Sequence, residues 1–279
     1  MSSKDAWSCP RAQQLILEAV SSTPPRLDWA ALALCLLETP HLEMEKVLLR
    51  LDELAEAVRA RMGRDPWQAI PSLRRVLADE EGYGSAPAFE YTPETCLLTS
   101  MLETRRGLPI TLSILYLEVA RRVGIPLYGV SLPGHFLVAA PVSTQRWVID
   151  PSFGGEILTE EGCGMRVQQL SPHVHFRPSM LEPTPARNIA LRLLNTQKRL
   201  YLANDEVEQA FRVVDLMLTL SPNHPGKLRD RASMLTTLGA YRAALKDIEQ
   251  CLSLSPNAPD RPALELTAHA LRVRAEQLN

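Results

Sequence analysis

His135 and Asp150 are the two residues of this chain whose types and spacing could perform acid–base chemistry. Each lies in a short apolar segment, HFLVAAP or RWVIDP, that is typical of a β-strand. An apolar helix is expected just before them, at about 109–123. A nucleophile at the start of such a helix would be activated by the imidazole, and the carboxylate would orient that imidazole. The helix contains no cysteine, so the element order alone does not establish this chemistry.

The two strands that carry His135 and Asp150 are expected to form a hairpin. A two-residue loop at Val142-Ser143 places His135 directly opposite Asp150, with about 5 Å between the Cβ atoms. A four-residue loop shifts the register and leaves the two as diagonal neighbours. The opposed register brings a hydrogen bond between imidazole and carboxylate within reach.

The elements around this centre are mostly helical. Apolar periodicity predicts helices at 11–20, 29–37, 41–62, 93–102 and 109–123. The last of these begins at Pro109, which suits a first helical turn, and Gly124 with Ile125-Pro126 should stop it. LYGVSL reads as a strand. The stretch 159–187 is rich in Gly and Pro, so mostly irregular structure is expected there.

The last third of the chain contains an internal repeat. SPNHP at 221–225 recurs as SPNAP at 255–259, an offset of 34 residues, and the same offset aligns Ala210 with Ala244. Small residues on one helix face with this period are typical of tetratricopeptide repeats. About two units are visible, whereas a solenoid needs roughly three to bury a continuous core. The segment is therefore expected to dock on the preceding domain.

Three stretches, PGHFLV, WVIDPSFGG and RRGLPITLSILYLEVARRVGIP, together resemble the SirB-type branch of the transglutaminase-like superfamily. The C-terminal helices resemble that family's trailing tetratricopeptide-type segment. The resemblance implies an α+β fold: a transglutaminase-like (papain-like) core with N-terminal helices and an all-α C-terminal segment. The expected parts are an N-terminal helical part of the core at 1–85, the α+β core at 86–180, and docked tetratricopeptide-like helices at 181–279.

The resemblance also assigns roles to residues. His135 matches the histidine and Asp150 the aspartate of the family's catalytic triad. The cysteine of active members corresponds here to Pro109 or Ile110, so the position of the nucleophile is vacant. A thioester intermediate cannot form without a nucleophile at that place.

Four other residues could supply a displaced nucleophile. Thr111 and Ser113 lie in the first turns of the helix, where hydroxyls more often hydrogen-bond to backbone. Cys96 lies in the preceding helical segment and is expected to be a buried, inert thiol. Cys163, between two glycines, is expected in a loop or exposed.

Ligand and metal sites are weaker candidates. Arg105 and Arg106 precede the helix and could bind a carboxylate or phosphate, although a solvated turn is the competing interpretation. His173 and His175 share a strand face but have no third ligand, so no metal and no cofactor are expected.

Composition excludes several classes of protein. The net charge is −2, which gives no electrostatic reason to expect binding to nucleic acid or an anionic membrane. The arginine pairs read as solvated helix edges: Arg74-Arg75, Arg105-Arg106 and Arg121-Arg122. Five scattered cysteines, no signal-peptide pattern and no long apolar run favour the cytoplasm.

Three functions remain open. The first is a catalytically degenerate transglutaminase-like protein that binds or scaffolds a protein or peptide partner. The alternative is an acyl-transfer or peptidase-type enzyme with His135 as base, Asp150 as orienter and a displaced nucleophile. In the third, the C-terminal helices form a peptide-binding module. The sequence sets no oligomeric state.

Overall fold

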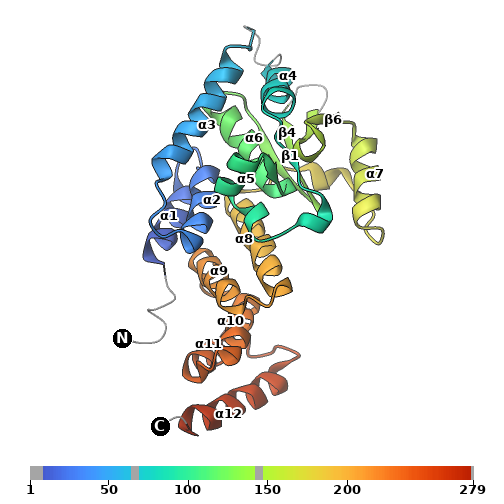
Figure 1. The fold of residues 1–279 in the computed structure, drawn as a ribbon. Coiled ribbons are helices and arrows are strands. Elements are labelled where there is room, and N and C mark those ends of the chain that lie inside the picture. The colour runs from blue at the N-terminus through green and yellow to red at the C-terminus, as the bar shows by residue number, and fades with distance from the viewer. Residues whose placement is uncertain (1–8, 64–68, 142–146, 278–279) are drawn as a thin grey trace. The chain divides into compact units, whose positions relative to one another are not determined.

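The computed structural model describes residues 9–63, 69–141 and 147–277. Its contacts divide the chain into two compact units. One is Glu18–Leu193, called here the core unit. The other, the repeat unit, comprises the described residues of Met1–Leu17 and Leu194–Asn279. Figure 1 gives the order of the elements along the chain. The domain borders expected at 85 and 180 stay predictions.

Helices make up the first part of the core unit. They are α2 (Leu27–Glu38), α3 (Met44–Arg59), α4 (Ala69–Arg74), a π-helical turn at Arg75–Glu80 and α5 (Leu98–Thr104), and α1 (Pro10–Ser21) precedes them. Short 3-10 turns lie at Ala88–Glu90 and Glu94–Cys96. The helix expected at 93–102 is thus a 3-10 turn followed by α5. No helix in the described part of the chain is long and apolar enough to cross a membrane.

Helix α6 (Pro109–Val123) is the central helix of the core unit. Pro109 occupies its first turn, and Gly124 ends it in the left-handed conformation, φ 78°, which glycine adopts without steric cost. The Gly124 N–H donates to the carbonyls of the last turn, as a helix C-terminus requires. Every residue from Ile110 to Ala120 is buried, so the helix is enclosed on all sides. This confirms the helix that the sequence predicts.

The main sheet contains four antiparallel strands in sequential order. They are β3 (Tyr128–Leu132), β4 (His135–Ala140), β5 (Trp147–Asp150) and β6 (Glu156–Leu158). The 3-10 turn η5 (Pro151–Phe153) joins β5 to β6. A separate parallel pair joins β1 (Gly84–Ser85) to β2 (Arg106–Gly107).

The register between β4 and β5 differs from the register expected for a hairpin with a two-residue loop. Val138 pairs with Ile149, and Ala140 with Trp147. Continuing this ladder places Asp150 opposite Leu137, so His135 is its diagonal neighbour, as a four-residue loop requires. The loop itself, including Val142-Ser143, lies outside the described residues. Of the two registers that the sequence left open, the structure has the diagonal one and not the direct opposition of His135 and Asp150. Both side chains project from one face of the sheet.

The stretch 159–187 is more regular than expected. Residues Glu160–Leu170 form helix α7, which lies beside β6 (Figure 1). The Thr159 hydroxyl caps it by accepting the Gly162 N–H at 3.1 Å. Cys163 and Val167 of this helix are buried against the sheet, so the expectation that Cys163 is exposed or in a loop is wrong. Burial of this apolar face stabilises a helix despite its two glycines.

One arginine pair is not a solvated helix edge. The Arg122 side chain is only 9% exposed and contacts Asp28 and Glu118, each at 2.7 Å. Both carboxylates are buried. The group is called here the Arg122 cluster and consists of Arg26, Asp28, Asp52, Glu118, Arg121 and Arg122. It joins the start of α2 to the end of α6.

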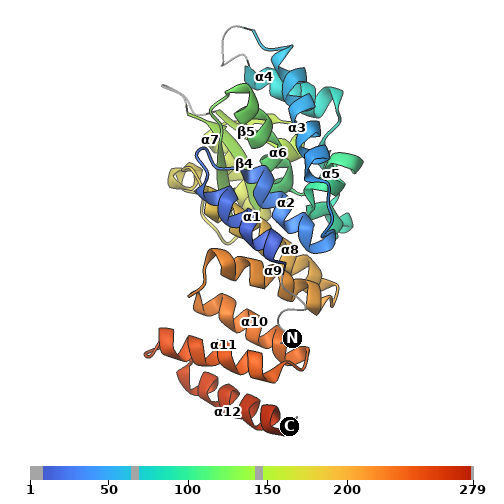
Figure 2. The same ribbon diagram turned by 90° about the vertical axis from the view of Figure 1, so that its left-hand side faces the viewer.

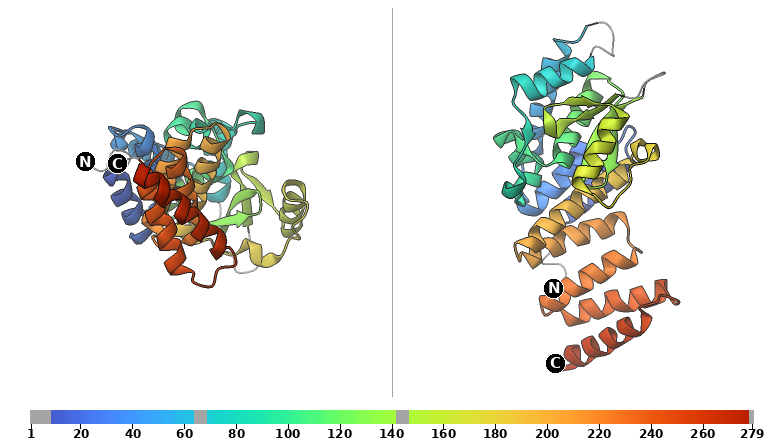
Figure 3. Two further views of the ribbon diagram at one scale, coloured as in Figure 1. Left: turned by 90° about the horizontal axis from the view of Figure 1, so that it is seen from below. Right: turned by 90° about the vertical axis from the view of Figure 1, so that its right-hand side faces the viewer.

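The repeat unit is helical. Helix α8 (Ala186–Ala203) begins in the core unit and ends here, followed by α9 (Val207–Leu220), α10 (Pro225–Thr237), α11 (Tyr241–Leu254) and α12 (Arg261–Gln277). Helices α9 and α11 start and end 34 residues apart, as the repeat predicts. Figure 2 shows α9–α12 stacked in succession, and Figure 3 (right) shows the stack from the opposite side. Gln13 of α1 donates to Asp215 of α9 at 2.8 Å, and α1 belongs to this unit up to Leu17.

Candidate functional site

His135 is the first residue of β4 and follows a tight turn. Gly134 in that turn has φ 72°, a conformation that favours glycine. Arg192 of α8 holds the turn: one guanidinium nitrogen, Nη2, donates to the carbonyls of Leu132 and His135 at 2.9 and 2.8 Å. Its Nη1 donates to Ser131 Oγ at 2.8 Å. The backbone that carries the imidazole is therefore fixed from outside the sheet.

Asp150 ends β5 and is fully buried. Its Oδ2 lies 2.8 Å from His135 Nε2, and its Oδ1 accepts the Ser152 N–H at 3.0 Å. The bond from Ser152 closes an Asx turn, in which an Asp side chain accepts the backbone N–H two residues further along the chain. The carboxylate thus has a partner on each oxygen, which fixes its plane and the orientation of the imidazole.

Arg166 and Phe153 cover the pair. The Arg166 Nε lies 3.4 Å from Asp150 Oδ2, and its Nη2 donates to Glu156 at 3.2 Å. The guanidinium lies 3.8 Å from the centre of the Phe153 ring, within the range of a cation–π contact. The same ring meets the imidazole edge to face, 6.3 Å between centroids. His135 is left only 4% exposed, whereas Phe153 is 54% exposed.

The hydroxyl candidates make other bonds. Thr111 Oγ1 donates to the Cys96 carbonyl at 3.0 Å, and Ser113 Oγ donates to the Phe136 carbonyl at 3.2 Å. Both residues are completely buried. Neither hydroxyl is therefore directed at the imidazole, whose bond in the described part of the chain is to Asp150. The hydroxyls thus bond to backbone as foreseen, but the prediction that these bonds are local is wrong: their acceptors are carbonyls of other segments.

Strand alternation explains this separation. His135 projects from the same face of β4 as Leu137 and Ala139, which pack with Cys163 and Val167 of α7. Phe136 projects from the opposite face, where Ser113 of α6 bonds to its carbonyl. The imidazole therefore faces α7, and the helix expected to carry a nucleophile packs on the other face of the sheet.

Comparison with known proteins identifies this arrangement. Residues 45–195, which include α6, His135 and Asp150, match the model of the transglutaminase-like superfamily. The chain belongs to the transglutaminase-like superfamily. Residues 197–271 match a tetratricopeptide-repeat model, so the resemblance of the repeat unit is confirmed as well.

The similar proteins come from several bacteria. A UPF0162 protein of Xylella fastidiosa (strain Temecula1) is 37% identical over 192 residues, 67% of this chain and 68% of that protein. A UPF0162 protein of Pseudomonas aeruginosa is 27% identical over 252 residues, 89% of this chain and 92% of that protein. A third, from Vibrio cholerae, is 27% identical over 236 residues, with coverage of 84% and 86%. The likeness thus extends through both units.

The two arginines before α6 of the transglutaminase-like core differ in their surroundings. Arg105, at φ 60°, donates from Nη1 to the carbonyl and to Oε2 of Glu81, both at 2.8 Å. Its guanidinium also lies 5.7 Å from the centre of the Tyr83 ring. Arg106 is exposed on β2. Arg105 therefore stabilises its own turn, and ligand binding by either arginine stays a prediction.

The metal candidates do not share a strand face, because they do not lie on a strand. His173 and His175 are both exposed in irregular structure after α7. Among the described residues of the transglutaminase-like core and the repeat unit, no three His, Cys, Asp or Glu side chains form a group that could hold a metal ion.

Four residues of the site escaped the sequence analysis. Ser152 had a local signal, because Asp-Pro-Ser favours a turn in which Asp accepts a backbone N–H. Phe153, Arg166 and Arg192 had no such local signal. Arg166 and Arg192 come from helices α7 and α8, which are distant in sequence from the pair. Cys96, in contrast, is where it was expected, buried beside the start of α6.

Cys96 is expected to resist alkylation in the folded protein. Burial raises the pKa of its thiol to about 12, although a hydrogen bond from Thr111 opposes this. At pH 8 the reactive thiolate is then about 1 in 10⁴ of the thiol. Iodoacetamide followed by peptide mass mapping should label half-buried Cys9 and leave Cys96 unmodified. In urea all five cysteines should react. Rapid labelling of Cys96 that disappears in His135→Ala would instead identify it as a displaced nucleophile.

Proposed function

We propose that this chain is a catalytically degenerate transglutaminase-like protein that acts by binding or scaffolding a protein or peptide partner. One observation carries the proposal. Every nucleophile candidate near α6 is engaged elsewhere: Thr111 and Ser113 donate to backbone carbonyls, and Cys96 is a buried thiol of raised pKa. The nucleophile position itself is occupied by Pro109 or Ile110.

The retained His–Asp pair is consistent with a structural role. Asp150 contacts the turn after β5 and Arg166 of α7, and His135 contacts both Asp150 and the Phe153 ring. A buried polar group requires such partners, whether or not it takes part in catalysis. The pair therefore ties α7 to the sheet.

The repeat unit supplies the binding side of the proposal. Stacked helix pairs of this kind present extended surfaces to other proteins. The chain has near-neutral charge, which favours protein or peptide partners over nucleic acid or an anionic membrane. We propose that the protein acts in the cytoplasm. Its assignment to the SirB-type branch stays a prediction from the sequence motifs.

Acyl transfer tests the degenerate site. The full-length protein, incubated with casein and dansylcadaverine, should incorporate no more label than the His135→Ala variant, because no nucleophile starts the reaction. Label that depends on His135 would overturn the proposal in favour of an acyl-transfer enzyme with a displaced nucleophile.

Site-directed photocrosslinking tests the partner. Benzoylphenylalanine is placed in turn at exposed Leu202, Leu254 and Leu266 of the repeat unit, with exposed Leu49 of α3 as the matched control. Irradiation in cells should give discrete heavier species from repeat positions and none from Leu49. The same absence at all repeat positions would contradict a scaffolding role for this unit.

A further inference from the structure

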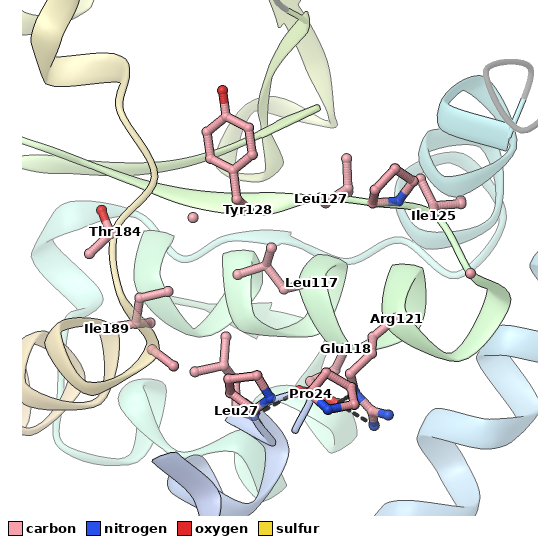
Figure 4. Close-up of a pocket in the computed structure, with 15 residues that line it drawn as sticks. Pro24, Leu27, Leu117, Glu118, Arg121, Ile125, Leu127, Tyr128, Thr184 and Ile189 are labelled. Atoms are coloured by element: carbon pink, nitrogen blue, oxygen red, sulfur yellow. Dashed lines mark hydrogen bonds and ion pairs between the residues drawn. The ribbon is translucent and has the colours of Figure 1, made fainter. Parts of the chain in front are cut away.

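The core unit contains a pocket of about 420 Å³ that is separate from the His135 site. It is bounded by the C-terminal half of α6, the segment that leads into β3, the turn before α2 and the first turn of α8. Figure 4 shows Leu117 in its middle, with Thr184 and Ile189 on one side and Ile125 and Leu127 on the other. A volume of this size is typical of small-molecule sites.

Most of the pocket wall is apolar. Leu27, Leu117, Ile125, Leu127 and Ile189 line it, together with three prolines. A wall of this kind binds a hydrocarbon body by removing apolar surface from water. The specificity must come from the few polar groups that the wall contains.

The acceptors at the charged end of the pocket are already occupied. Glu118 Oε1 accepts the Leu27 N–H at 2.7 Å. Its Oε2 accepts Arg121 Nε and Nη2 at 2.9 and 2.8 Å, and Arg122 Nη1 at 2.7 Å. A ligand amine would have to displace one of these charge-assisted bonds, which are the strong ones. The carboxylate is therefore not free to bind a cation.

One donor at that end remains open. Arg121 lines the pocket with a side chain that is 27% exposed, and Figure 4 shows it beside Glu118. Its Nε and Nη2 are used by Glu118. Among the described residues, Nη1 of Arg121 donates no hydrogen bond. A guanidinium with a free edge in a mostly apolar wall favours a carboxylate as its partner.

A second donor comes from the edge of β3. The Gly129 carbonyl accepts the Thr184 N–H at 2.9 Å, and the Ser131 N–H donates to Thr184 Oγ1 at 3.1 Å. Alternate residues of β3 therefore point their backbone groups away from β4. The Gly129 N–H shares this direction, lines the pocket, and has no acceptor within the described part of the chain. Arg121 Nη1 and the Gly129 N–H are thus two donors that a ligand in the pocket could reach.

We infer that this pocket binds an amphipathic carboxylate, with its apolar body on Leu117 and its carboxylate on Arg121 Nη1. The Gly129 N–H is available to a carbonyl or a second acceptor of the same ligand. The chemistry fits a fatty-acid-type molecule and the C-terminal carboxylate of an apolar peptide, and the experiment below separates the two. The inference goes beyond the proposed scaffolding role and does not depend on His135.

Calorimetric titration of the full chain tests the ligand class. Octanoate and the peptide acetyl-Leu-Leu-Val with a free carboxylate are compared with octanol, octylamine and the amidated peptide. A ligand of this size is expected to bind with Kd of about 0.1–1 mM. Binding of octanoate identifies the fatty-acid source, and tighter binding of the peptide acid identifies the peptide source. Equal binding of octanol or octylamine, or no carboxylate binding up to about 10 mM, overturns the inference.

Two variants localise the binding. Arg121→Gln should weaken the carboxylate about tenfold or more and leave octanol unchanged, since it removes one charge-assisted bond. Ala186→Phe, at the start of α8, should fill the pocket and abolish binding without touching the Arg122 cluster. Arg272→Gln and Ala263→Phe on exposed positions of α12 are the matched controls and should bind as the parent does. Undiminished binding by folded Ala186→Phe overturns the site.

Discussion

Replacement of Arg122 by methionine is expected to lower the free energy of unfolding by about 3–5 kcal/mol. Arg122 contacts Asp28, Glu118 and Asp52, each at 2.7 Å. Burial raises the pKa of Asp28, but hydrogen bonds from Arg26 and Arg122 outweigh it and hold that pKa below its usual value. Burial raises the pKa of Glu118, with Asp28 adding to the effect. Without Arg122, two buried carboxyl groups each lose a charged partner that they share. Urea unfolding followed by fluorescence measures the loss.

Two further variants show whether the loss comes from uncompensated charge. Arg272→Met breaks an ion pair with Glu249 whose side chains are 51% and 50% exposed. It should cost less than about 1 kcal/mol. Adding Asp28→Asn and Glu118→Gln to Arg122→Met should restore part of the stability, because neutral groups tolerate burial better than unpaired charges. A change in Arg122→Met no larger than in Arg272→Met would contradict a stabilising cluster.

Replacement of Asp150 by alanine is expected to cost about 2–4 kcal/mol. The change removes the acceptor of the Ser152 N–H and the partner of His135, both at buried positions. It also separates Arg166 from the end of β5, although the contact with Glu156 remains. Asp150→Asn keeps one acceptor oxygen, so it should lose less. The measurement is again urea unfolding, with hydrogen exchange of the Ser152 amide as a local readout.

The matched control for Asp150 is Asp260→Ala, which breaks a half-exposed ion pair with Arg229. It should change the free energy of unfolding by less than about 1 kcal/mol. If Asp150→Ala kept the stability of the parent protein and a slowly exchanging Ser152 amide, the His135–Asp150 pair would not stabilise the fold. The retained His–Asp pair would then need a functional explanation.

The parts of the fold that sequence predicted well have local causes. Helix α6 begins at Pro109 and ends before Gly124, because these residues set its first turn and its left-handed cap. The repeat offset appears as two helices of equal length, α9 and α11, that end in similar conformations at Ser221 and Ser255. Such signals need only neighbouring residues, so they can be read without the rest of the chain.

Helix α7 shows where local reading fails. Its two glycines and the prolines after it favour irregular structure. The helix forms because Cys163 and Val167 bury an apolar face on the sheet, an interaction between distant segments. The prediction for Arg122 was wrong for the same reason. A charged residue near a helix end is expected to be solvated, but Asp28 and Asp52, 94 and 70 positions away in the sequence, place their carboxylates against it.

By itself, the sequence determined the candidate pair His135 and Asp150, the buried helix before them and its lack of a cysteine, since these depend on residue type and order. Only the tertiary structure decided that His135 lies diagonally from Asp150 and faces α7. It also decided that Thr111 and Ser113 donate to carbonyls of other segments. The physical reason is that a hydrogen bond depends on distance and direction between atoms, and segments far apart in the chain supply its two ends.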